Sequence, residues 1–513
     1  MKYAIIPAAG SGTRMKELGK NYAKTVLPYE GKPILIHIIE SIISEVEPDE
    51  IIVVYGNEEH REQLQEVVRL YDLNVKFVPV IPIGRVGPAQ SIASGIPWDV
   101  TESDSLFIHL SDFVVSDKSA LHLAPDSISA FPVVDQHRWC MVKESKSGLE
   151  FFDKPKTHVD TDLAVAGLYH ISDAKQFLFS YLYNTSGSQG ESQISEVLSF
   201  YGKTHRLSID KIKEDALKDF GTIEEFIQNR GISKTRCFNY ISVKKHSVTK
   251  TSVDGRKMFA EHQWYSAIPD DLRRFVPMTY AFQNASREQR PGYSMERLKS
   301  TNLRDLYLYL DRSEESWNEV FDSVFDFIDV CKQESTSGSS FWEFLFDKNL
   351  SRIKGTAYQD EAVDFLESLH SMISNSRFFN ETTVYHGDLH FANMFYCFHY
   401  KQLKVIDPNG RLMGHWFYDL AKLNHSVFGK YDWIDSELYH DSGFMDRGCA
   451  GVVDAFDGLL GKIGLDEGEI RLLNALTASL FLTMIPLHSH SPKNQELFLS
   501  EFRRIRDFTF IQC

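Results

Sequence analysis

A glycine-rich turn near the start of the chain follows an apolar strand and could bind a phosphate group. Residues 4–6 are apolar and lead into Gly10 and Gly12. Glycine lacks Cβ, so backbone N–H groups can approach phosphate oxygens closely and φ can be positive. Arg14 and Lys24 follow, and both cations could reach the same ligand. Glycine pairs are often only turns, but the preceding strand and the downstream lysine favour a phosphate site.

A carboxylate at the end of another apolar strand could bind a metal ion. Asp112 closes the apolar segment 106–112. An acid at a strand tip that faces phosphates can hold Mg²⁺, a hard cation that takes oxygen ligands. An aspartate that merely begins a turn is the common alternative. The strand context favours the metal-binding interpretation.

The first part of the chain carries a wider set of motifs around these residues. It reads Ala8-Ala9-Gly10-Ser-Gly12-Thr13-Arg14-Met, and Lys24 is followed by Thr-Val-Leu-Pro and Gly-Lys-Pro. This pattern resembles the nucleotidyltransferases that join a nucleoside monophosphate to a sugar phosphate, over about residues 1–232. The chain departs from the family pattern at Pro7, usually leucine, and at Ala23, usually proline.

The resemblance implies a role for each matching residue. Backbone and small side chains would bind the nucleotide at Ala8, Ala9, Gly10, Gly12, Thr13, Gly87 and Gln90. Arg14 and Lys24 would be catalytic, and Asp112 and Asp219 would bind Mg²⁺. The substrate would contact Asp153, Lys154 and Gly167, where Asp153 replaces the family's glutamate. A sugar phosphate oxygen would attack the α-phosphate of a nucleoside triphosphate in line, which requires positioning and charge neutralisation but no protein nucleophile.

Alternating elements must position these residues. Helical spacing over 34–43 and 63–71 alternates with the apolar strands 51–55 and 75–80. This order predicts a mainly parallel α/β sheet covered on both faces, with ligands beyond the carboxyl ends of its strands. The resemblance implies a doubly wound, Rossmann-like (GT-A-like) sheet.

The second half of the chain contains a different motif. Residues 384–394 read Val-Tyr-His-Gly-Asp-Leu-His-Phe-Ala-Asn-Met, and the apolar segment 403–407 ends in aspartate. The motif resembles the aminoglycoside phosphotransferase and choline kinase group. Asp388 would accept a proton from a substrate hydroxyl, and Asn393 and Asp407 would bind Mg²⁺.

Two histidines and one aspartate around this motif have other interpretations. His386 and His390 are spaced like a zinc pair, but the adjacent glutamate of such sites is absent. His386 is expected to orient the loop. Asp419 resembles a family aspartate that braces the same loop.

A lysine and a glutamate upstream fit the same resemblance. Residues 237–253 alternate as a hairpin does and include Lys250, and Glu261 lies on the helical pattern 258–265. A strand lysine paired with a helix glutamate holds ATP phosphates in kinase-like folds. Lys244 and Lys245 are rival lysines. Glu296 lies in a segment that resembles the hinge presenting backbone groups to adenine, whereas no Gly-x-Gly-x-x-Gly loop precedes Lys250.

The remainder of this half is expected to be helical. Apolar residues recur at helical spacing over 361–374, 451–460 and 470–484, whereas 332–340 is polar and is expected to be a loop. The resemblance implies a bilobal, protein-kinase-like α+β domain of the aminoglycoside phosphotransferase type. We expect domains at 1–232 and 233–513, with a small lobe at about 233–300 and a helical lobe at about 301–513.

Composition limits the setting in which the protein works. The 513 residues are too many for one core, and the net charge of −16 argues against nucleic-acid or anionic-membrane binding. Six scattered cysteines favour a reducing compartment. We expect no signal peptide, a buried helix rather than a membrane span at 475–487, and a cytoplasmic enzyme acting on small molecules. The sequence does not predict an oligomeric state.

Together the motifs predict a two-enzyme fusion that uses Mg²⁺, ATP and a second nucleoside triphosphate. The C-terminal half would phosphorylate a small hydroxylated compound, a sugar in the favoured interpretation. The N-terminal half would couple that phosphate to a nucleotide, giving an activated precursor for a surface polysaccharide or cell wall. An amino-alcohol kinase joined to a cytidylyltransferase of the phosphocholine type is one alternative. A fusion with one non-catalytic, nucleotide-binding regulatory half is the other.

Overall fold

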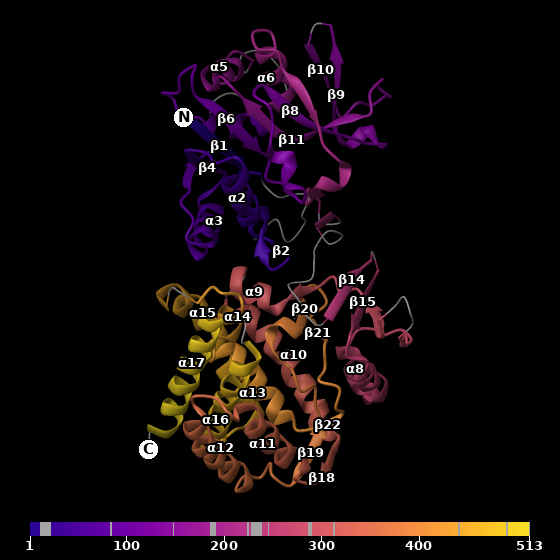
Figure 1. Ribbon diagram of the computed structural model, residues 1–513, viewed down its shortest axis with the longest axis vertical. Coiled ribbons are helices and arrows are strands. Elements are labelled where there is room, and N and C mark those ends of the chain that lie inside the picture. The colour runs from indigo at the N-terminus through magenta and orange to yellow at the C-terminus, as the bar shows by residue number, and fades with distance from the viewer. Residues whose placement is uncertain are drawn as a thin grey trace. The chain divides into compact units, whose positions relative to one another are not determined.

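The chain forms two compact units, Met1–Gly231 and Ile232–Cys513. The structure is a computed structural model that describes residues 1–10, 22–82, 85–146, 148–184, 191–222, 225–226, 239–244, 246–285, 290–310, 313–439, 442–488 and 491–511. Figure 1 shows the two units along the chain.

The first unit is built on a sheet whose central strands are parallel. These strands are β5 (Lys76–Pro79), β4 (Glu50–Tyr55), β1 (Lys2–Pro7) and β6 (Ser105–His109), adjacent in this order. β4 and β1 are apolar along nearly their whole length, as strands covered on both faces are. Their carboxyl ends share one edge, where the loops of interest begin.

The other strands of this sheet make it mixed rather than mainly parallel. They are β8 (Ser127–Pro132), β9 (Cys140–Ser145), β10 (Gly148–Asp153), β11 (Leu163–Ile171) and β12 (Ser208–Lys211). β11 runs antiparallel to β6, β8 and β9, and only β12 pairs in parallel, with β8. The mainly parallel prediction holds only up to β6, because buried parallel and antiparallel strands share the same apolar pattern.

Helices cover both faces of the sheet, as the pattern predicted. Figure 1 shows α2 (Ile34–Glu45) and α3 (Glu58–Leu70) on one side of β1 and β4, with α5 (Ala174–Asn184) and α6 (Ile194–Tyr201) on the other. Ile5 and Ile52 of the sheet share a core with Phe177 of α5 and Val197 of α6. The cap of α3 is local, since Asn57 accepts the His60 N–H.

Short paired segments complete the first unit. α4 (Pro88–Gly95) packs on β1 and β4. β2 (Pro28–Tyr29) pairs with β3 (Lys32–Pro33). β7 (Phe113–Val115) pairs antiparallel with β13 (Leu217–Asp219). The last pair brings two predicted metal ligands, about a hundred residues apart in sequence, to one place.

The second unit begins with a small antiparallel sheet. β14 (Asn239–Val243) and β15 (Ser247–Ser252) form the predicted hairpin, and β16 (Gly292–Glu296) pairs with β15. α8 (Gly255–Ala267) follows β15 and packs on β15 and β16. Asp254 caps this helix by accepting the Lys257 N–H.

Helices dominate the remainder of the second unit. They are α9 (Leu303–Tyr309), α10 (Glu314–Gln333), α11 (Ser340–Ile353), α12 (Gln359–Ser374), α13 (Trp416–Val427), α14 (Tyr431–Asp435), α15 (Ser442–Ile463), α16 (Glu467–Met484) and α17 (Pro492–Ile511). α10 buries one apolar face, including Trp317, Val324 and Ile328, and packs against α15. Short strands lie among them, namely β17 (Thr301–Asn302), β18 (Ser335–Ser337), β19 (Glu381–Val384), β20 (Met394–Cys397), β21 (Gln402–Val405) and β22 (Met413–Gly414).

One segment differs from its prediction. Residues 332–340 were expected to form a loop, but Ser335–Ser337 is strand β18, paired antiparallel with β19. All three β18 residues are exposed and polar. A short strand of exposed polar residues lacks the alternation of apolar and polar residues by which strands are predicted, so β18 is recognised only by its pairing with β19.

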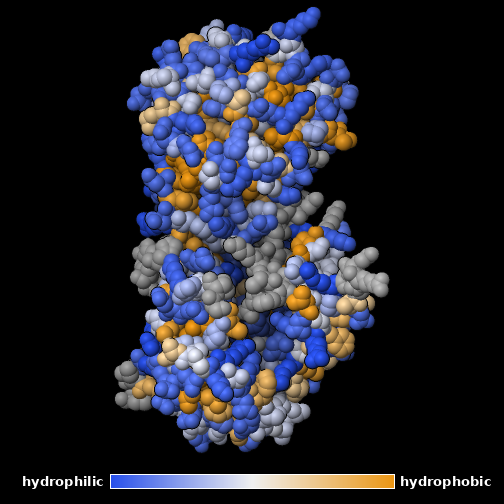
Figure 2. All heavy atoms as spheres, viewed as in Figure 1, coloured by the Kyte–Doolittle hydropathy of each residue, from blue (hydrophilic) through white to orange (hydrophobic). Residues whose placement is uncertain are grey.

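One apolar helix could span a membrane by length and composition alone. It covers Glu467–His488, and 78% of its most apolar window is buried inside the protein. Its residues Leu472–Met484 pack against α13 and α17, as the predicted buried helix at 475–487 requires. On the face seen in Figure 2, hydrophobic residues occur in small groups between hydrophilic ones.

Candidate active sites

The glycine-rich turn of the first unit leaves the carboxyl end of β1, beside β4. The Ala8 N–H donates to the Val54 carbonyl at 2.8 Å. A Cβ on Gly56 would lie 2.7 Å from the Ala9 carbonyl oxygen, so the two segments approach closely because Gly56 has no side chain. Ala8, Ala9 and Gly10 therefore line the sheet edge, while Gly12, Thr13 and Arg14 lie outside the described residues.

The two predicted metal-binding aspartates of this unit lie close together. Asp219 ends β13 opposite Phe113, and the Phe220 N–H donates to the Asp112 carbonyl at 2.7 Å. Burial, and next the charge of Asp112, raise the pKa of Asp219 to about 6, whereas the Gly221 N–H and Lys24 act in the opposite direction. The structure thus brings together Asp112, Asp219 and Lys24, three residues from separate segments.

This pair of carboxylates fits a magnesium ion. Among the described residues no group of three or more His, Cys, Asp or Glu side chains could hold a metal. Mg²⁺, however, is commonly held by one or two carboxylates together with substrate phosphates. The mutual repulsion that raises the pKa of Asp219 is the kind of strain that a bound cation relieves.

The loop before α4 is held by a distant segment. Gly87 has φ +154°, and a Cβ there would lie 2.5 Å from the Ser192 carbonyl oxygen. The Ala89 N–H donates to that same oxygen at 3.1 Å, and the Ser192 N–H donates to the Val86 carbonyl at 2.9 Å. Gln90 is buried, and its amide donates to the Ile81 carbonyl at 3.0 Å. Gly87 therefore joins two loops, and the Gln90 amide group is engaged within the protein.

The predicted substrate residues lie on β10 and β11. Gly167 sits where the β11–β8 register shifts, and its carbonyl accepts the Leu110 N–H at 3.0 Å, next to the loop that carries Asp112. Asp153 ends β10, and Lys154 follows it with φ 43°. Both of these side chains are exposed. Gly167 thus adjoins the aspartate pair, while Asp153 and Lys154 stand at the end of the neighbouring strand.

Residues without a motif also shape this site. His109 is buried, and its Nδ1 lies 2.7 Å from the Leu110 carbonyl oxygen. Burial lowers its pKa to about 4, so the ring is neutral and props the Asp112 loop through stacking on Phe113. Arg138 forms an ion pair with Glu225, which also accepts the Thr222 N–H. No motif or periodic pattern in the sequence predicts these contacts.

A charge cluster, in which Lys250 and Glu261 are buried and Asp407 is half-buried, joins the small sheet of the second unit to its helical part. The Lys250 Nζ lies 2.7 Å from Glu261 Oε2 and 3.2 Å from Asp407 Oδ2. The Tyr293 hydroxyl donates to the same Glu261 oxygen at 3.2 Å. Asp407 has φ 60°, and its N–H donates to the Tyr265 hydroxyl of α8. Lys250, Glu261 and Asp407 thus form one unit, whereas the rival Lys244 is exposed and Lys245 lies outside the described residues.

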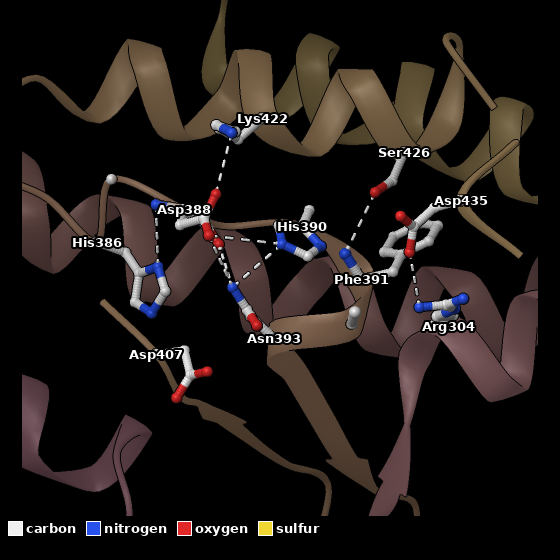
Figure 3. A network of polar contacts seen from close by, with 12 residues as sticks. Arg304, His386, Asp388, His390, Phe391, Asn393, Asp407, Lys422, Ser426 and Asp435 are labelled. Atoms are coloured by element: carbon white, nitrogen blue, oxygen red, sulfur yellow. Dashed lines mark hydrogen bonds and ion pairs between the residues drawn. The ribbon is translucent and has the colours of Figure 1, made fainter. Parts of the chain in front are cut away.

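Asp388 lies between a lysine and an asparagine (Figure 3). Its Oδ1 is 3.0 Å from the Lys422 Nζ of α13, and its Oδ2 is 3.3 Å from the Asn393 Nδ2. Asn393 Nδ2 also donates to the Asp388 carbonyl at 2.9 Å. Figure 3 shows Asp407 on the Asn393 side of Asp388, away from Lys422. The two carboxylate oxygens of Asp388 therefore face different surroundings.

Asp419 holds the loop that carries Asp388. It is 1% exposed, and its two oxygens accept the N–H groups of His386 and Gly387, each at 2.6 Å. The Asp388 N–H donates to the His386 Nδ1 at 3.3 Å, so His386 also shapes the loop. A Cβ on Gly387 would lie 1.9 Å from the Asn409 amide, so this position requires glycine.

The remaining predicted residue, Glu296, ends β16. It pairs with Ser247, and its N–H donates to the Met278 carbonyl at 2.8 Å. Residues 297–300, which follow Glu296, form neither helix nor strand and connect the small sheet to β17.

The second unit also offers a site that fits Mg²⁺. Asn393 and Asp407 supply an amide oxygen and a carboxylate at the ends of paired strands, since Met394 of β20 opposes Val405 of β21. Lys250 adds a cation to the same group. The arrangement can bind a phosphate chain through Lys250 while Asp388 accepts a proton nearby.

Comparisons with known proteins cover the first unit. Residues 4–139 match the family model of the MobA-like NTP transferase domain. The bifunctional protein GlmU of Methanococcus maripaludis is 26% identical over 217 residues, which are 40% of this chain and 49% of that protein. The UTP–glucose-1-phosphate uridylyltransferase AglF of Haloferax volcanii is 24% identical over 240 residues, which are 43% of this chain and 92% of that protein.

A solved structure covers the same part of the chain. UDP-glucose pyrophosphorylase complexed with UDP-glucose is 20% identical, covers 45% of this chain and 97% of its own, and has a TM-score of 0.38. The chain spans about half the length of the GlmU proteins that it matches. Residues 4–139 of the N-terminal unit are thus similar to the MobA-like NTP transferase domain, and they form most of the parallel part of its sheet.

Proposed function

We propose that the chain is a bifunctional enzyme that phosphorylates a small hydroxylated substrate with ATP and then couples the product phosphate to a nucleotide. The kinase reaction belongs to residues 233–513, a bilobal domain of the aminoglycoside phosphotransferase type, with lobes at about 233–300 and 301–513. The nucleotidyltransferase reaction belongs to residues 1–232. The product is an activated, nucleotide-linked sugar for a surface polysaccharide or cell wall, made in the cytoplasm.

The cluster of buried Lys250 and Glu261 with half-buried Asp407, beside Asp388, is the observation that carries the kinase proposal. Lys250 is fixed by two carboxylates and is placed to bind ATP phosphates. Asp388 accepts the proton of the acceptor hydroxyl, whose oxygen forms a bond to the γ-phosphorus. The bond between that phosphorus and its bridging oxygen breaks, and ADP leaves.

The transferase proposal rests on the match to the MobA-like domain and on the adjoining Asp112 and Asp219. An oxygen of the substrate phosphate forms a bond to the α-phosphorus of a nucleoside triphosphate, and pyrophosphate leaves. Lys24 neutralises charge on the phosphates, and the backbone of Ala8 to Gly10 approaches the nucleotide. Arg14 and the backbone of Gly12 and Thr13 complete this grip, while Lys154, Asp153 and Gly167 bind the sugar phosphate.

Mg²⁺ bound at Asp112 and Asp219, and at Asn393 and Asp407, would supply charge neutralisation for the triphosphates. The protein's own residues align the phosphates, and Asp388 accepts one proton. Glu296 belongs to the segment that receives the adenine of ATP, and Gly87 and Gln90 belong to the loop beside the nucleobase in the first unit.

Two variants test the assignment. Asp112→Asn should abolish pyrophosphate release and leave ADP formation intact, while Asp388→Asn should do the reverse. Asp99→Asn and Asp360→Asn, at exposed carboxylates of the same two units, are the matched controls. Each reaction is assayed over a grid of acceptors and the four triphosphates CTP, UTP, GTP and dTTP. If either variant retains its own activity, the assignment of that half fails.

The same grid separates the alternatives. A non-catalytic half would show no turnover with any acceptor or triphosphate, and its aspartate variant would have no effect. An amino-alcohol kinase joined to a cytidylyltransferase would use choline or ethanolamine together with CTP.

A further inference from the structure

Cationic side chains from three elements lie near Lys422 and Asp388, close enough for their charges to act on one another. Lys348 and Arg352 lie on α11, Lys422 on α13 and Arg411 after β21. We call Lys348, Arg352, Arg411 and Lys422 the cation cluster. The chain as a whole is acidic, with a net charge of −16. Overall basicity therefore does not explain this local concentration of positive charge.

Contacts and electrostatic effects define the cluster. Phe344, Lys348 and Arg352 are four residues apart on α11 and share one helix face. The Arg411 guanidinium lies 3.4 Å from the Phe344 ring centroid, and the Lys348 ammonium lies 5.8 Å from it. Phe344 is therefore a platform on which cations from α11 and from the loop after β21 gather.

Lys348 connects this platform to Asp388. Burial lowers the pKa of Lys348 to about 8, and the neighbouring charges with the largest effects belong to Arg352, Lys422, Asp388 and Arg411. Both Asp388 and Arg352 also influence the Tyr418 phenol. The cluster thus extends from the Asp388 carboxylate to the half-buried face of α11 that carries Phe344, Lys348 and Arg352.

Among the residues that the structure describes, Asp388 is the only carboxylate that forms an ion pair with the cation cluster. Lys422 pairs with Asp388. Within the described part of the chain, Lys348, Arg352 and Arg411 form no ion pair with a carboxylate. Lys348 and Arg352 are half-buried, whereas Arg411 is exposed. Half-buried cations that repel one another cost free energy unless an anion joins them. Such a group is suited to a carboxylate or a phosphate.

We propose that the cation cluster binds an anionic group, a carboxylate or a phosphate, on the molecule that accepts the phosphoryl group at Asp388. This inference rests on the proposed kinase function and gives its substrate class. Lys422 of the cluster pairs with Asp388 Oδ1, whereas Asn393 contacts Oδ2, so Lys422 lies opposite the side assigned to ATP. An acceptor with a quaternary or primary amine would be repelled, which disfavours the amino-alcohol alternative.

A charge-matched acceptor series tests the proposal with the full-length enzyme. One set is D-glucose, D-glucuronate, D-glucose 6-phosphate and D-glucosamine, and a second is glycerol, glycerate, glycerol 3-phosphate and ethanolamine. The kcat/KM for ADP formation should be at least about tenfold higher for an acidic member than for its neutral and amino counterparts. A comparison of the carboxylate members with the phosphate members shows which of the two anions the cluster prefers. A faster neutral or amino member overturns the inference.

A binding measurement decides the matter even if no acceptor in the series reacts. With both nucleotide sites filled by non-hydrolysable triphosphates and Mg²⁺, inorganic phosphate should raise the melting temperature more than chloride at equal ionic strength. The double variant Lys348→Met/Arg352→Met should lose at least half of this shift, while Lys354→Met, at the exposed end of α11, should keep it. An equal shift in all three proteins overturns the inference.

The two proposals fail in different ways. If phosphate raises the melting temperature through the cluster but no ADP forms, the anion site is supported and the proposed kinase activity is rejected. If ADP forms with neutral or amino acceptors, and Asp388→Asn abolishes this reaction, the kinase activity is supported and the anion site is rejected. For an acidic acceptor, the double variant should raise KM by about tenfold or more and leave the KM for ATP unchanged. A raised KM for ATP would instead assign the cluster to ATP and overturn the inference.

Discussion

The Lys250 ammonium lies 2.7 Å from the Glu261 carboxylate, in a contact between β15 and α8 that leaves each residue 2% exposed. Burying a charge is unfavourable unless it is paired, and here the lysine is paired with Asp407 as well. The pair therefore holds a cation in a fixed position at the junction of the small sheet and the helices.

Lys250→Met should lower the rate of ADP formation by about a hundredfold or more, because the phosphate-binding charge is lost. Pyrophosphate release by the first unit should be unchanged. Coupled assays for ADP and pyrophosphate on one preparation measure both effects. Lys244→Met, an exposed lysine of the same hairpin, is the matched control. A larger loss in the Lys244 variant would assign the phosphate contact to the rival lysine.

Asp419→Asn should destabilise the second unit by about 1–3 kcal/mol, because the asparagine amide would place an N–H against a backbone N–H that now donates to a carboxylate oxygen. Urea unfolding followed by tryptophan fluorescence measures the change. ADP formation should fall with it, since Asp388 lies on the same loop. Full stability in the variant would show that the loop is held by other contacts.

The stabilising effect of Asp419 should also depend on pH. Burial raises the pKa of Asp419 to about 7, although the N–H groups of His386 and Gly387 act to lower it. The unfolded chain has a carboxyl pKa of about 3.9, so folding favours the protonated form. This stabilisation is complete below about pH 4 and is lost as pH rises through about 7. The stability of the native protein relative to Asp419→Asn should therefore fall between about pH 4 and pH 7 and then level off, measured by urea unfolding.

Gly87→Ala should impair the first unit more than Gly148→Ala. Both glycines have φ values unfavourable for alanine, +154° and +123°. A Cβ at Gly87 would also lie 2.5 Å from the Ser192 backbone oxygen, whereas none of the described atoms lies within 4 Å of a Cβ at Gly148. Gly148→Ala reports the effect of backbone strain alone, whereas Gly87→Ala adds the displacement of the Ser192 segment. Pyrophosphate assays should show a raised KM for the triphosphate in the Gly87 variant, and equal effects would exclude the displacement.

Acceptor binding at the cation cluster should weaken above about pH 8. Burial and neighbouring cations lower the pKa of Lys348 to about 8, so its charge is present below that pH and lost above it. The KM for an acidic acceptor should rise from about pH 7 to about pH 9. Lys348→Arg should flatten this profile, because arginine stays charged. A profile that is the same in both proteins would exclude Lys348 from acceptor binding.

Local patterns predicted the elements better than their pairing. The hairpin of β14 and β15, helix α8 and the buried helix α16 follow directly from alternation and apolar spacing. The antiparallel half of the first sheet does not, because strand direction depends on how the chain returns to the sheet. β18 was missed because its polar residues carry no strand pattern.

The same limit applies to the sites. Asp388, Asn393 and Asp407 are found through the resemblance of their motif to a kinase family, and the structure brings them close together. Lys422 and the other members of the cation cluster lie on separate elements, so spacing alone cannot connect them. The i, i+4 repeat of Lys348 and Arg352 was the available signal, but on its own it resembles an ordinary solvated helix face.

Helix α8 contacts the loops around Asp388 at three points. The Trp264 indole donates to the Tyr385 carbonyl at 2.9 Å, the Tyr265 hydroxyl accepts the Asp407 N–H, and Gly410 touches Ala260 where any side chain would collide. Swinging this helix outward would break all three contacts together. Glu261, which lies on α8, is therefore mechanically coupled to Asp407 and to the loop that carries Asp388, and a displacement of the helix would disturb all of them at once.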